Sequence, residues 1–291
     1  MPNAAAALTL VPGTDLAPAD WHAAFTAAFA DYLIGPFNLT LAQWPGFLAR
    51  QGIDLALSRG AVLEGALVAF ALVAPRPTRG RWRLGTMGAL PAARGSGAAP
   101  TLLDDFVHRA RDSGVGALEL EVFAANARAL RLYQGRGFEI VHPLRGYERA
   151  PAPAANGALP VQSVTLEEAW RWLDASDARI ADLPLQVTSQ VTRVAAAAAP
   201  ADAPLQAWRS GDAQLIFGEQ PSQGAVAIHS LVDPGPAQAG AQALAEALVA
   251  RYPGHLLRAP ALQRPDLGGD ALQRVGFVPQ ALHQWLMRRV L

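Results

Sequence analysis

A glycine-rich turn joins a predicted strand to a predicted helix in the first half of the chain, and this unit constrains the fold more than any other feature. Residues 82–90 are predicted to form a strand that Pro91 ends, and the helical spacing of apolar residues predicts a helix over residues 101–112. Between them, residues 94–99 read Arg-Gly-Ser-Gly-Ala-Ala. Glycine permits sharp turns and close approach of a ligand, and free N–H groups at a helix N-terminus attract negative charge. The unit indicates an α/β fold with a phosphate or pyrophosphate site, and a plain surface turn is the alternative.

Two ordered motifs in this half resemble those of a known family. Arg94-x-x-Gly97-x-Ala99 resembles the Arg/Gln-x-x-Gly-x-Gly/Ala signature of the GCN5-related N-acetyltransferases (GNATs), and the stretch from Ala89 and Pro91 to Gly97 resembles its longer form. The family's second motif resembles, in order and spacing, Leu120-Glu121-Val122, Asn126, Ala129, Leu132-Tyr133 and Gly137-Phe138. The resemblance covers residues 16–149 and is specific, because both motifs occur in the expected order.

The resemblance implies a fold, a cosubstrate and a reaction. The fold would be α/β (α+β), with a mixed, splayed β-sheet flanked by helices. Acetyl-CoA would be the cosubstrate, with its pyrophosphate on the N–H groups of residues 94–99 and its pantetheine arm along the strand end at residues 87–90. The acetyl group would pass directly to a primary amine of a small molecule or a peptide. The residues that would hold acetyl-CoA are Ala89, Leu90, Arg94, Gly95, Ser96, Gly97, Ala98, Ala99, Asn126 and Tyr133.

Direct acetyl transfer to an amine needs a base for the ammonium, a donor for the oxyanion and an acid for the thiolate. Tyr133 is the candidate acid, near the start of a predicted helix, because a phenol can donate a proton at neutral pH; a core tyrosine is the alternative. Glu119 and Glu121 share one strand face, and we expect one to be solvated and the other hydrogen-bonded. Glu121 resembles the base of ribosomal-protein alanine N-acetyltransferases in its position. Glu119, another residue or bulk water remain alternatives, since the strand over residues 82–90 carries no acid, although many relatives place one there.

The sequence of the second half of the chain resembles that of the first half, but several of the motif residues are replaced. Pro234 and Gly240 align with Pro91 and Gly97 at an offset of 143 (240 − 97), and Gly276-Phe277 aligns with Gly137-Phe138 at an offset of 139 (276 − 137). Two nearly equal offsets indicate an internal repeat at the scale of a domain. We expect a GNAT domain over residues 1–150, a linker rich in Pro, Ala, Asn and Gly over residues 151–159, and a degenerate GNAT-like domain over residues 160–291. In the second copy Ala237 replaces the loop arginine, Leu272 replaces the tyrosine, and His255-Leu256-Leu257-Arg258 replaces the strand that carries the glutamates.

Apolar spacing and turn residues also predict the remaining elements of the first half. The aromatic residues Tyr32, Phe37 and Trp44 lie where an acceptor would approach, and we expect them to belong to the core. The predicted helices cover residues 17–33, 39–51 and 125–135, and the predicted strands cover residues 55–58, 61–62, 66–73, 117–123 and a segment near Tyr147, with a hairpin turn at Glu64-Gly65.

Composition excludes several other classes of protein. The chain has 291 residues, 51% of them hydrophobic, no cysteine and a formal net charge of +0. Thiolate chemistry and disulfides are excluded, and a nucleic-acid or anionic-membrane partner recognised by bulk charge is not expected. The six histidines show no ligand spacing, so we expect no metal. Met1-Pro2-Asn3-Ala4 lacks the basic start of a signal peptide, and no long apolar run occurs, so a cytoplasmic protein is expected, with a homodimer possible.

Two readings compete with an N-acetyltransferase. A non-catalytic acyl-CoA-binding or sensor protein would keep the glycine-rich loop without turnover, but the presence of both Glu121 and Tyr133 favours an enzyme. A nucleotide-binding module would use a similar loop, but the chain has no Gly-x-x-x-x-Gly-Lys-Ser/Thr sequence.

Overall fold

The computed structural model describes residues 8–152 and 161–291 of the chain. Residues 1–4, on which the expectation of no signal peptide rests, and residues 153–159 of the predicted linker lie outside the described part. Contacts among the residues divide the chain into two compact units. Unit 1 comprises Met1–Glu121, Asn126–Glu139 and Met287–Leu291, and unit 2 comprises Val122–Ala125 and Ile140–Leu286. The predicted boundaries at residues 150 and 160 concern where one repeat ends and the next begins, and they stay a prediction.

The strands of unit 1 form a mixed sheet. In spatial order they are β1 (Thr9–Pro12), β2 (Asp54–Leu63), β3 (Ala66–Arg76), β4 (Arg81–Ala89) and β5 (Ala117–Phe123). The first four pair antiparallel, and β4 pairs parallel with β5. The two short strands predicted over residues 55–62 are one strand. The hairpin turn predicted between β2 and β3 is confirmed, because Glu64 and Gly65 have φ values of +52° and +81°, as a tight two-residue turn requires.

The sheet of unit 1 splays between β4 and β5. Residues 81–84 of β4 pair in register with residues 117–120 of β5. From residue 86 onward, β4 pairs with β3 on one side, and within the described chain it has no β5 partner on the other. The mixed, splayed sheet is therefore confirmed, and the free edge of β4 is where the resemblance places the pantetheine arm.

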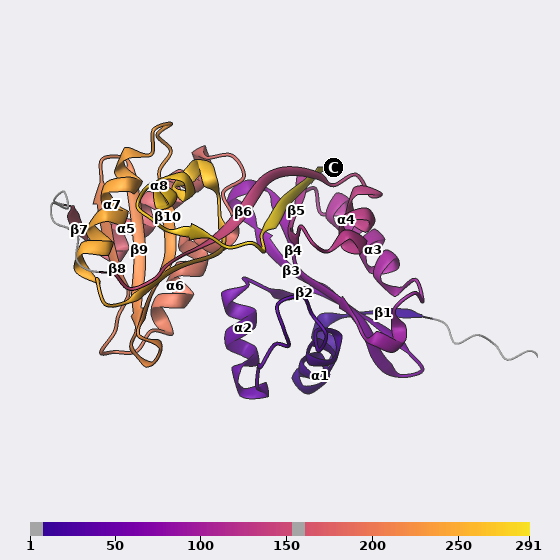
Figure 1. Cartoon of the computed structure of the whole chain (residues 1–291). Helices are drawn as coiled ribbons and strands as arrows, with labels where there is room; N and C mark the ends of the chain where they lie inside the picture. The colour runs from indigo at the N-terminus through magenta and orange to yellow at the C-terminus, as the bar shows by residue number, and fades with distance from the viewer. Residues whose placement is uncertain (1–7, 153–160) are drawn as a thin grey trace, which may run out of the picture. The chain divides into compact units, whose positions relative to one another are not determined.

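Helices cover both faces of this sheet, as Figure 1 shows. Helices α1 (Pro18–Ala28) and α2 (Trp44–Arg50) lie on one face, and α3 (Ala98–Asp112) and α4 (Ala127–Gln134) lie on the other. Helix α1 is shorter than predicted. Helix α3 begins earlier than predicted, because Pro100 fits its first turn, where no backbone N–H is needed. The aromatic residues Tyr32, Phe37 and Trp44 belong to the apolar cluster between α1, α2 and β3, so their expected place in the core is confirmed.

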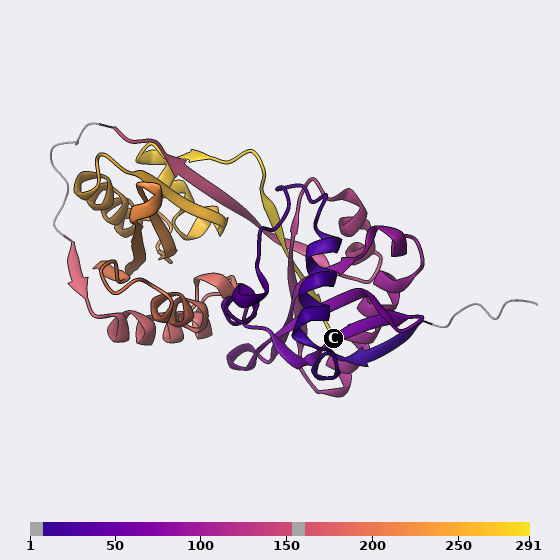
Figure 2. The ribbon, with the colours of Figure 1, turned by 90° about the horizontal axis from the view of Figure 1, so that it is seen from below.

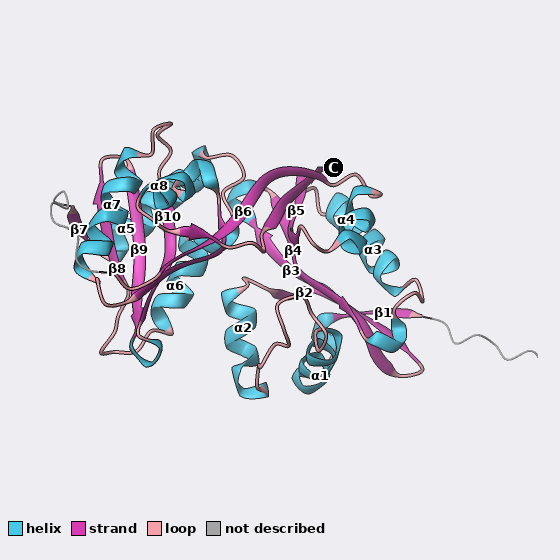
Figure 3. Ribbon diagram, viewed as in Figure 1, coloured by secondary structure: helices cyan, strands magenta, loops and turns pink. Residues whose placement is uncertain are grey.

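Unit 2 also has a central sheet with helices on both faces (Figure 3). Its strand order is β6 (Glu139–Arg149), β11 (Leu256–Gln263), β10 (Ala225–Val232), β9 (Ala213–Gln220), β8 (Gln206–Ser210) and β7 (Gln162–Val164), with the short β12 (Val278–Pro279) beside β6. Alternate residues of β9 point to opposite faces. Leu215 and Phe217 pack against α7 (Ala239–Arg251) and α8 (Gly269–Arg274), while Ile216 lies in the cluster formed with α5 (Leu166–Arg179); α6 (Ser189–Ala197) follows α5.

The two halves of the chain repeat one order of elements. From β7 to β13 (Gln284–Val290), the order strand, two helices, three strands, helix, strand, helix, strand is that of β1 to β6, with the short β12 added. The turns after α4 and α8 are equivalent in detail. Gly137 and Gly276 both have positive φ, and the N–H groups of Phe138 and Phe277 donate to Tyr133 and Leu272, at the offset of 139. The chain thus has two tandem domains of the same design.

The last strand of each repeat contains residues that belong to the unit formed mainly by the other repeat. Strand β6 ends the first repeat, but its residues from Ile140 belong to unit 2 and pair with β11 and β12. Strand β13 ends the second repeat, and residues 287–291 belong to unit 1, where the N–H of Leu291 donates to the carbonyl of Gly116 at 3.1 Å. Figure 2 shows the yellow end of the chain among the indigo and purple elements of unit 1.

Candidate functional site

The glycine-rich loop forms an open cradle of N–H groups at the start of α3. Gly95 and Gly97 have φ values of +91° and +88°, a backbone region that side chains with a Cβ rarely adopt. No atom lies within 4 Å of the position where a Cβ would stand on either glycine. The N–H groups of Gly95, Gly97 and Ala99 donate to no other atom of the described chain. A loop with unpaired donors at a helix N-terminus suits a pyrophosphate, so the residues present fit the implied cosubstrate.

Three other residues that were predicted to contact acetyl-CoA make hydrogen bonds within the loop or next to it. The N–H of Leu90 donates to Val68, and its carbonyl accepts from Ala93, each at 2.9 Å. The Ser96 hydroxyl accepts a hydrogen bond from the N–H of buried Ala98 at 3.3 Å. Leu90, Ser96 and Ala98 therefore hold the turn, while the free donors come from their neighbours.

The Arg94 side chain is engaged by the end of helix α1. Its two terminal nitrogens contact the two oxygens of Asp31, each at 2.6 Å, and one also donates to the carbonyl of Ala28 at 3.1 Å. This hydrogen bond and the charge of Arg94 hold the pKa of Asp31 below its ordinary value. No sequence signal linked Asp31 to Arg94, because the two residues are 63 positions apart and share no motif.

Asn126 contacts Tyr32, the residue that follows Asp31 in the sequence. Its side-chain oxygen accepts a hydrogen bond from the N–H of Ala129 at 3.1 Å, which caps helix α4. Its side chain also hydrogen-bonds Tyr32, an interaction that lowers the pKa of this tyrosine against the larger, raising effect of burial. Residues from both family-like motifs thus fasten residues 28–32.

Tyr133 lies in the last turn of α4, not near its start as the sequence analysis expected. Its side chain is buried, and burial raises its pKa well above the ordinary value for a tyrosine. Its hydroxyl makes no hydrogen bond to another described residue. A phenol in this state is protonated at neutral pH and has a donor to offer, which is what an acid requires.

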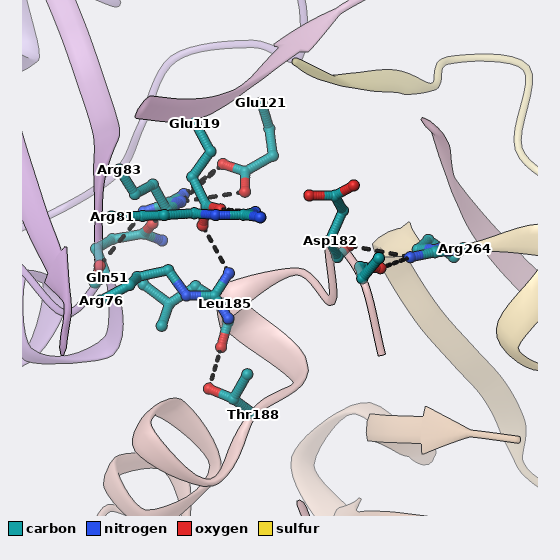
Figure 4. Close-up of polar contacts among 11 residues, drawn as sticks. Gln51, Arg76, Arg81, Arg83, Glu119, Glu121, Asp182, Leu185, Thr188 and Arg264 are labelled. Carbon is teal, nitrogen blue, oxygen red and sulfur yellow. Dashed lines mark hydrogen bonds and ion pairs between the residues drawn. The ribbon is translucent and has the colours of Figure 1, made fainter. Parts of the chain in front are cut away.

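The two glutamates of β5 are both buried in ion pairs, so the expectation that one of them is solvated is wrong. Glu119 contacts Arg76 at 2.6 Å and Arg81 at 3.4 Å. Glu121 contacts Arg83 at 2.7 Å, and both side chains are 3% exposed. Figure 4 shows these pairs, with Gln51 beside Arg83 at 3.3 Å. The arginines come from β3 and β4, and sheet pairing brings them to the glutamates because a buried carboxylate needs a partner.

In the matching region of unit 2, an acidic side chain lies at the start of the corresponding helix. Asp233 is buried, and its carboxylate accepts hydrogen bonds from the N–H groups of Gly235 and Ala241, each at 2.8 Å. The residue before α7 is Gln238, so the structural partner of Gly97 is Gln238, at an offset of 141 (238 − 97), and not Gly240 as the sequence alignment placed it. A Cβ on Gly240 would lie 2.4 Å from the carbonyl oxygen of Ser210, so Gly240 is required for packing.

The described residues contain neither a cluster suited to a metal ion nor a helix suited to crossing a membrane. No group of three or more His, Cys, Asp or Glu side chains in residues 8–152 and 161–291 could hold a metal ion. Within the same ranges, no helix is both long and apolar enough to cross a membrane.

The splayed sheet and the open loop have the arrangement that the sequence resemblance implies, and comparison with known proteins supports the resemblance. Residues 19–138 match the Acetyltransferase (GNAT) family. The first repeat therefore matches the GNAT family, and the second repeat has the same order of elements. Mycothiol acetyltransferase from Propionibacterium freudenreichii subsp. shermanii is 37% identical over 93 residues, which cover 31% of this chain and only 29% of that protein.

Solved structures share the fold over nearly the whole chain. A GCN5-related N-acetyltransferase from Sphaerobacter thermophilus has a TM-score of 0.66 at 17% identity, covering 97% of this chain and 95% of its own. Another from Kribbella flavida has a TM-score of 0.62 at 15% identity, covering 99% of this chain and 72% of its own. At these identities the likeness concerns the fold, and it extends across both repeats.

Proposed function

We propose that the protein is an acetyl-CoA-dependent N-acetyltransferase whose first repeat carries the reaction. The observation that carries this proposal is the cradle of unpaired N–H groups at Gly95, Gly97 and Ala99 beside the free edge of β4. In this site acetyl-CoA is a substrate, held through its pyrophosphate at the loop and through its pantetheine arm at the strand edge. Arg94 and Asn126 support the site by fastening residues 28–32 next to it.

The proposed reaction is a direct transfer to a primary amine. The amine nitrogen, once deprotonated, forms a bond to the acetyl carbonyl carbon as the carbon–sulfur bond breaks. Tyr133 gives its proton to the departing thiolate, and the proton lost by the ammonium passes to Glu121 or to solvent. The nitrogen loses a second proton as the amide forms, and this proton restores the Tyr133 hydroxyl. Because Arg83 engages both oxygens of Glu121, at 3.1 Å and 2.8 Å, a base role for this carboxylate requires that a lone pair not directed at Arg83 remain available.

A screen of amine acceptors with acetyl-CoA tests the proposal, with release of free thiol as the readout. The panel includes peptide N-termini, polyamines, antibiotic amines and amino-acid-like metabolites. Mycothiol-related amines are added, since one relative is a mycothiol acetyltransferase. Thiol release that depends on one acceptor class supports an enzyme. Tight binding of acetyl-CoA with no turnover on any acceptor would instead favour the acyl-CoA sensor.

We expect Gly97→Val to weaken acetyl-CoA binding by about tenfold or more, since the side chain would obstruct the close approach of pyrophosphate to the backbone. Calorimetry on the full chain measures the change. The matched control is Gly114→Val, because Gly114 also has a positive φ (+75°) and open space around it but follows the other end of α3. If affinity for acetyl-CoA falls in Gly97→Val but not in Gly114→Val, the fall comes from loss of the site and not from backbone strain. Equal affinity in a folded Gly97→Val protein would place the pyrophosphate elsewhere.

We also expect one acetyl-CoA per chain. The Asp233 carboxylate accepts a hydrogen bond from the N–H of Ala241 at the start of α7, and its negative charge disfavours a pyrophosphate there. Calorimetric stoichiometry measures this, and the Gly97→Val protein provides the control, since it should lose the single site. Two cosubstrates per chain, or one retained at full affinity in the variant, would contradict the expectation.

A further inference from the structure

An open surface cavity of about 460 Å³ lies in unit 1, and no residue of the glycine-rich loop lines it. Helix α3 contributes Asp104, His108 and Arg111, the turn after α4 contributes Arg136, and the last residues of the chain contribute Arg289. The Arg289 side chain donates to the carbonyl of Arg136, so the chain end is fastened to this turn. The walls of one cavity thus come from three separate segments.

Positive charge dominates this cavity, although the whole chain has a formal net charge of +0. Arg136 is neutralised by Asp104, which it contacts at 2.6 Å and 3.0 Å. Within the described residues, Arg111 and Arg289 have no carboxylate within ion-pair distance, and His108 contacts Asp112 outside the lining. Two guanidinium groups are therefore left without an ion-pair partner among the described residues.

The guanidinium groups affect one another. The pKa of Arg289 is lowered, first by burial and then by the charges of Arg111 and Arg136, against the opposing effect of Asp104. An anion bound between these like charges would be attracted to each guanidinium and would reduce the repulsion between them.

The cavity is separate from the pyrophosphate cradle. Asp104 follows Gly97 by seven residues along α3, and Arg111 follows it by fourteen (111 − 97). With a rise of 1.5 Å per residue, the lining extends from about 10 Å to about 20 Å along the helix axis. The anion here therefore need not be the one bound at the loop.

We propose that this cavity is a second anion site, which binds the phosphate group of a small phosphorylated metabolite. Guanidinium groups present paired donors that match phosphate oxygens, and two of them can engage one phosphate from both sides. The open cavity has room for an organic group attached to the phosphate, since its volume of about 460 Å³ exceeds the few water volumes of about 30 Å³ each that a phosphate occupies.

Phosphate in this site could come from such a metabolite or from the 3′-phosphate of coenzyme A, and the test separates the two. Binding of inorganic phosphate to the full chain is followed by calorimetry at low ionic strength, with and without saturating acetyl-CoA. We expect phosphate to bind in both conditions, and to bind also to the Gly97→Val protein. Loss of binding in the presence of acetyl-CoA would assign the anion to the cosubstrate and overturn the separate site.

Variants of Arg111 and Arg289 complete the test. We expect Arg111→Gln to weaken phosphate binding by roughly tenfold, and Arg111→Gln with Arg289→Gln to weaken it further. Arg111→Gln alone keeps the contact between Arg289 and Arg136, so it remains informative if the double variant is unstable. The matched control is Arg171→Gln, an exposed arginine of α5. Equal weakening in the control, or none in the folded Arg111→Gln protein, would overturn the proposal.

Discussion

Replacing Tyr133 by phenylalanine should lower kcat by roughly 10²-fold, the usual contribution of a general acid, while acetyl-CoA binding changes little. The ring packs near Phe138, with the ring centroids 6.0 Å apart, and phenylalanine keeps that packing. What the substitution removes is a hydroxyl whose pKa burial holds high and which has no partner among the described residues. Steady-state kinetics on the acceptor found by the screen measure kcat, and calorimetry measures the affinity for acetyl-CoA.

The control for this experiment is Tyr252→Phe. Tyr252 is also buried, but it lies in unit 2 and its hydroxyl donates to Glu219 at 2.9 Å. Its loss should cost stability without changing kcat. If kcat of Tyr133→Phe were near that of the native protein, Tyr133 would be a core residue, and positioning of the substrates would remain as the source of rate.

Glu121→Gln should have two effects at once, because Glu121 is both the candidate base and half of a buried ion pair. Breaking a buried pair leaves Arg83 uncompensated and destabilises the fold by about 3–5 kcal/mol. If the carboxylate is the base, activity should also fall most at lower pH, where the acceptor ammonium dominates. Chemical denaturation measures the first effect, and the pH dependence of kcat/KM measures the second.

The double variant Arg83→Gln with Glu121→Gln separates the two effects. Removing both charges removes the unpaired guanidinium and should restore much of the stability. An inactive but stable double variant would support a base role. Recovery of activity together with stability would show that Glu121 serves the fold alone. Arg76→Gln with Glu119→Gln provides a comparison, since Glu119 lies on the same strand as Glu121 and its pair with Arg76 is also buried; this variant additionally removes the contact of Glu119 with Arg81.

The sequence was sufficient for the parts of the site that depend on local backbone. The strand over residues 117–123 was predicted with the bounds that the structure has, and Gly97 lies directly before α3, in the positive-φ conformation that a glycine-rich turn implies. Such features follow from turn chemistry and from the alternation of side chains, which a single segment contains. The predicted helix over residues 125–135 begins two residues before α4, which Asn126 caps, and ends one residue after it, so its bounds already place Tyr133 in the last turn and not near the start.

The partners of the site residues could not be predicted, because they come from distant segments. Arg83 reaches Glu121 through the parallel register of β4 and β5, and Asp31 reaches Arg94 from the end of α1. Neither contact can be inferred from the residues that surround it in the sequence. The alignment of the repeats failed at the second loop for a related reason. The alignment matched Gly240 with Gly97. In the structure, Gln238 is the residue before α7 that corresponds to Gly97, and Asp233 accepts a hydrogen bond at the start of that helix.

The return of residues 287–291 to unit 1 has a consequence for how the protein is made. A ribosome delivers the chain from its N-terminus, and the first domain of a protein generally folds before the next is synthesised. Here Gly116 must wait for Leu291, 175 residues later (291 − 116), before its carbonyl is paired, and the turn at Arg136 must wait for Arg289. The nascent first repeat therefore leaves the exit tunnel with β5 still lacking its neighbour β13. Such late, long-range closure slows folding, so unit 1 can close only after residues 287–291 have been translated.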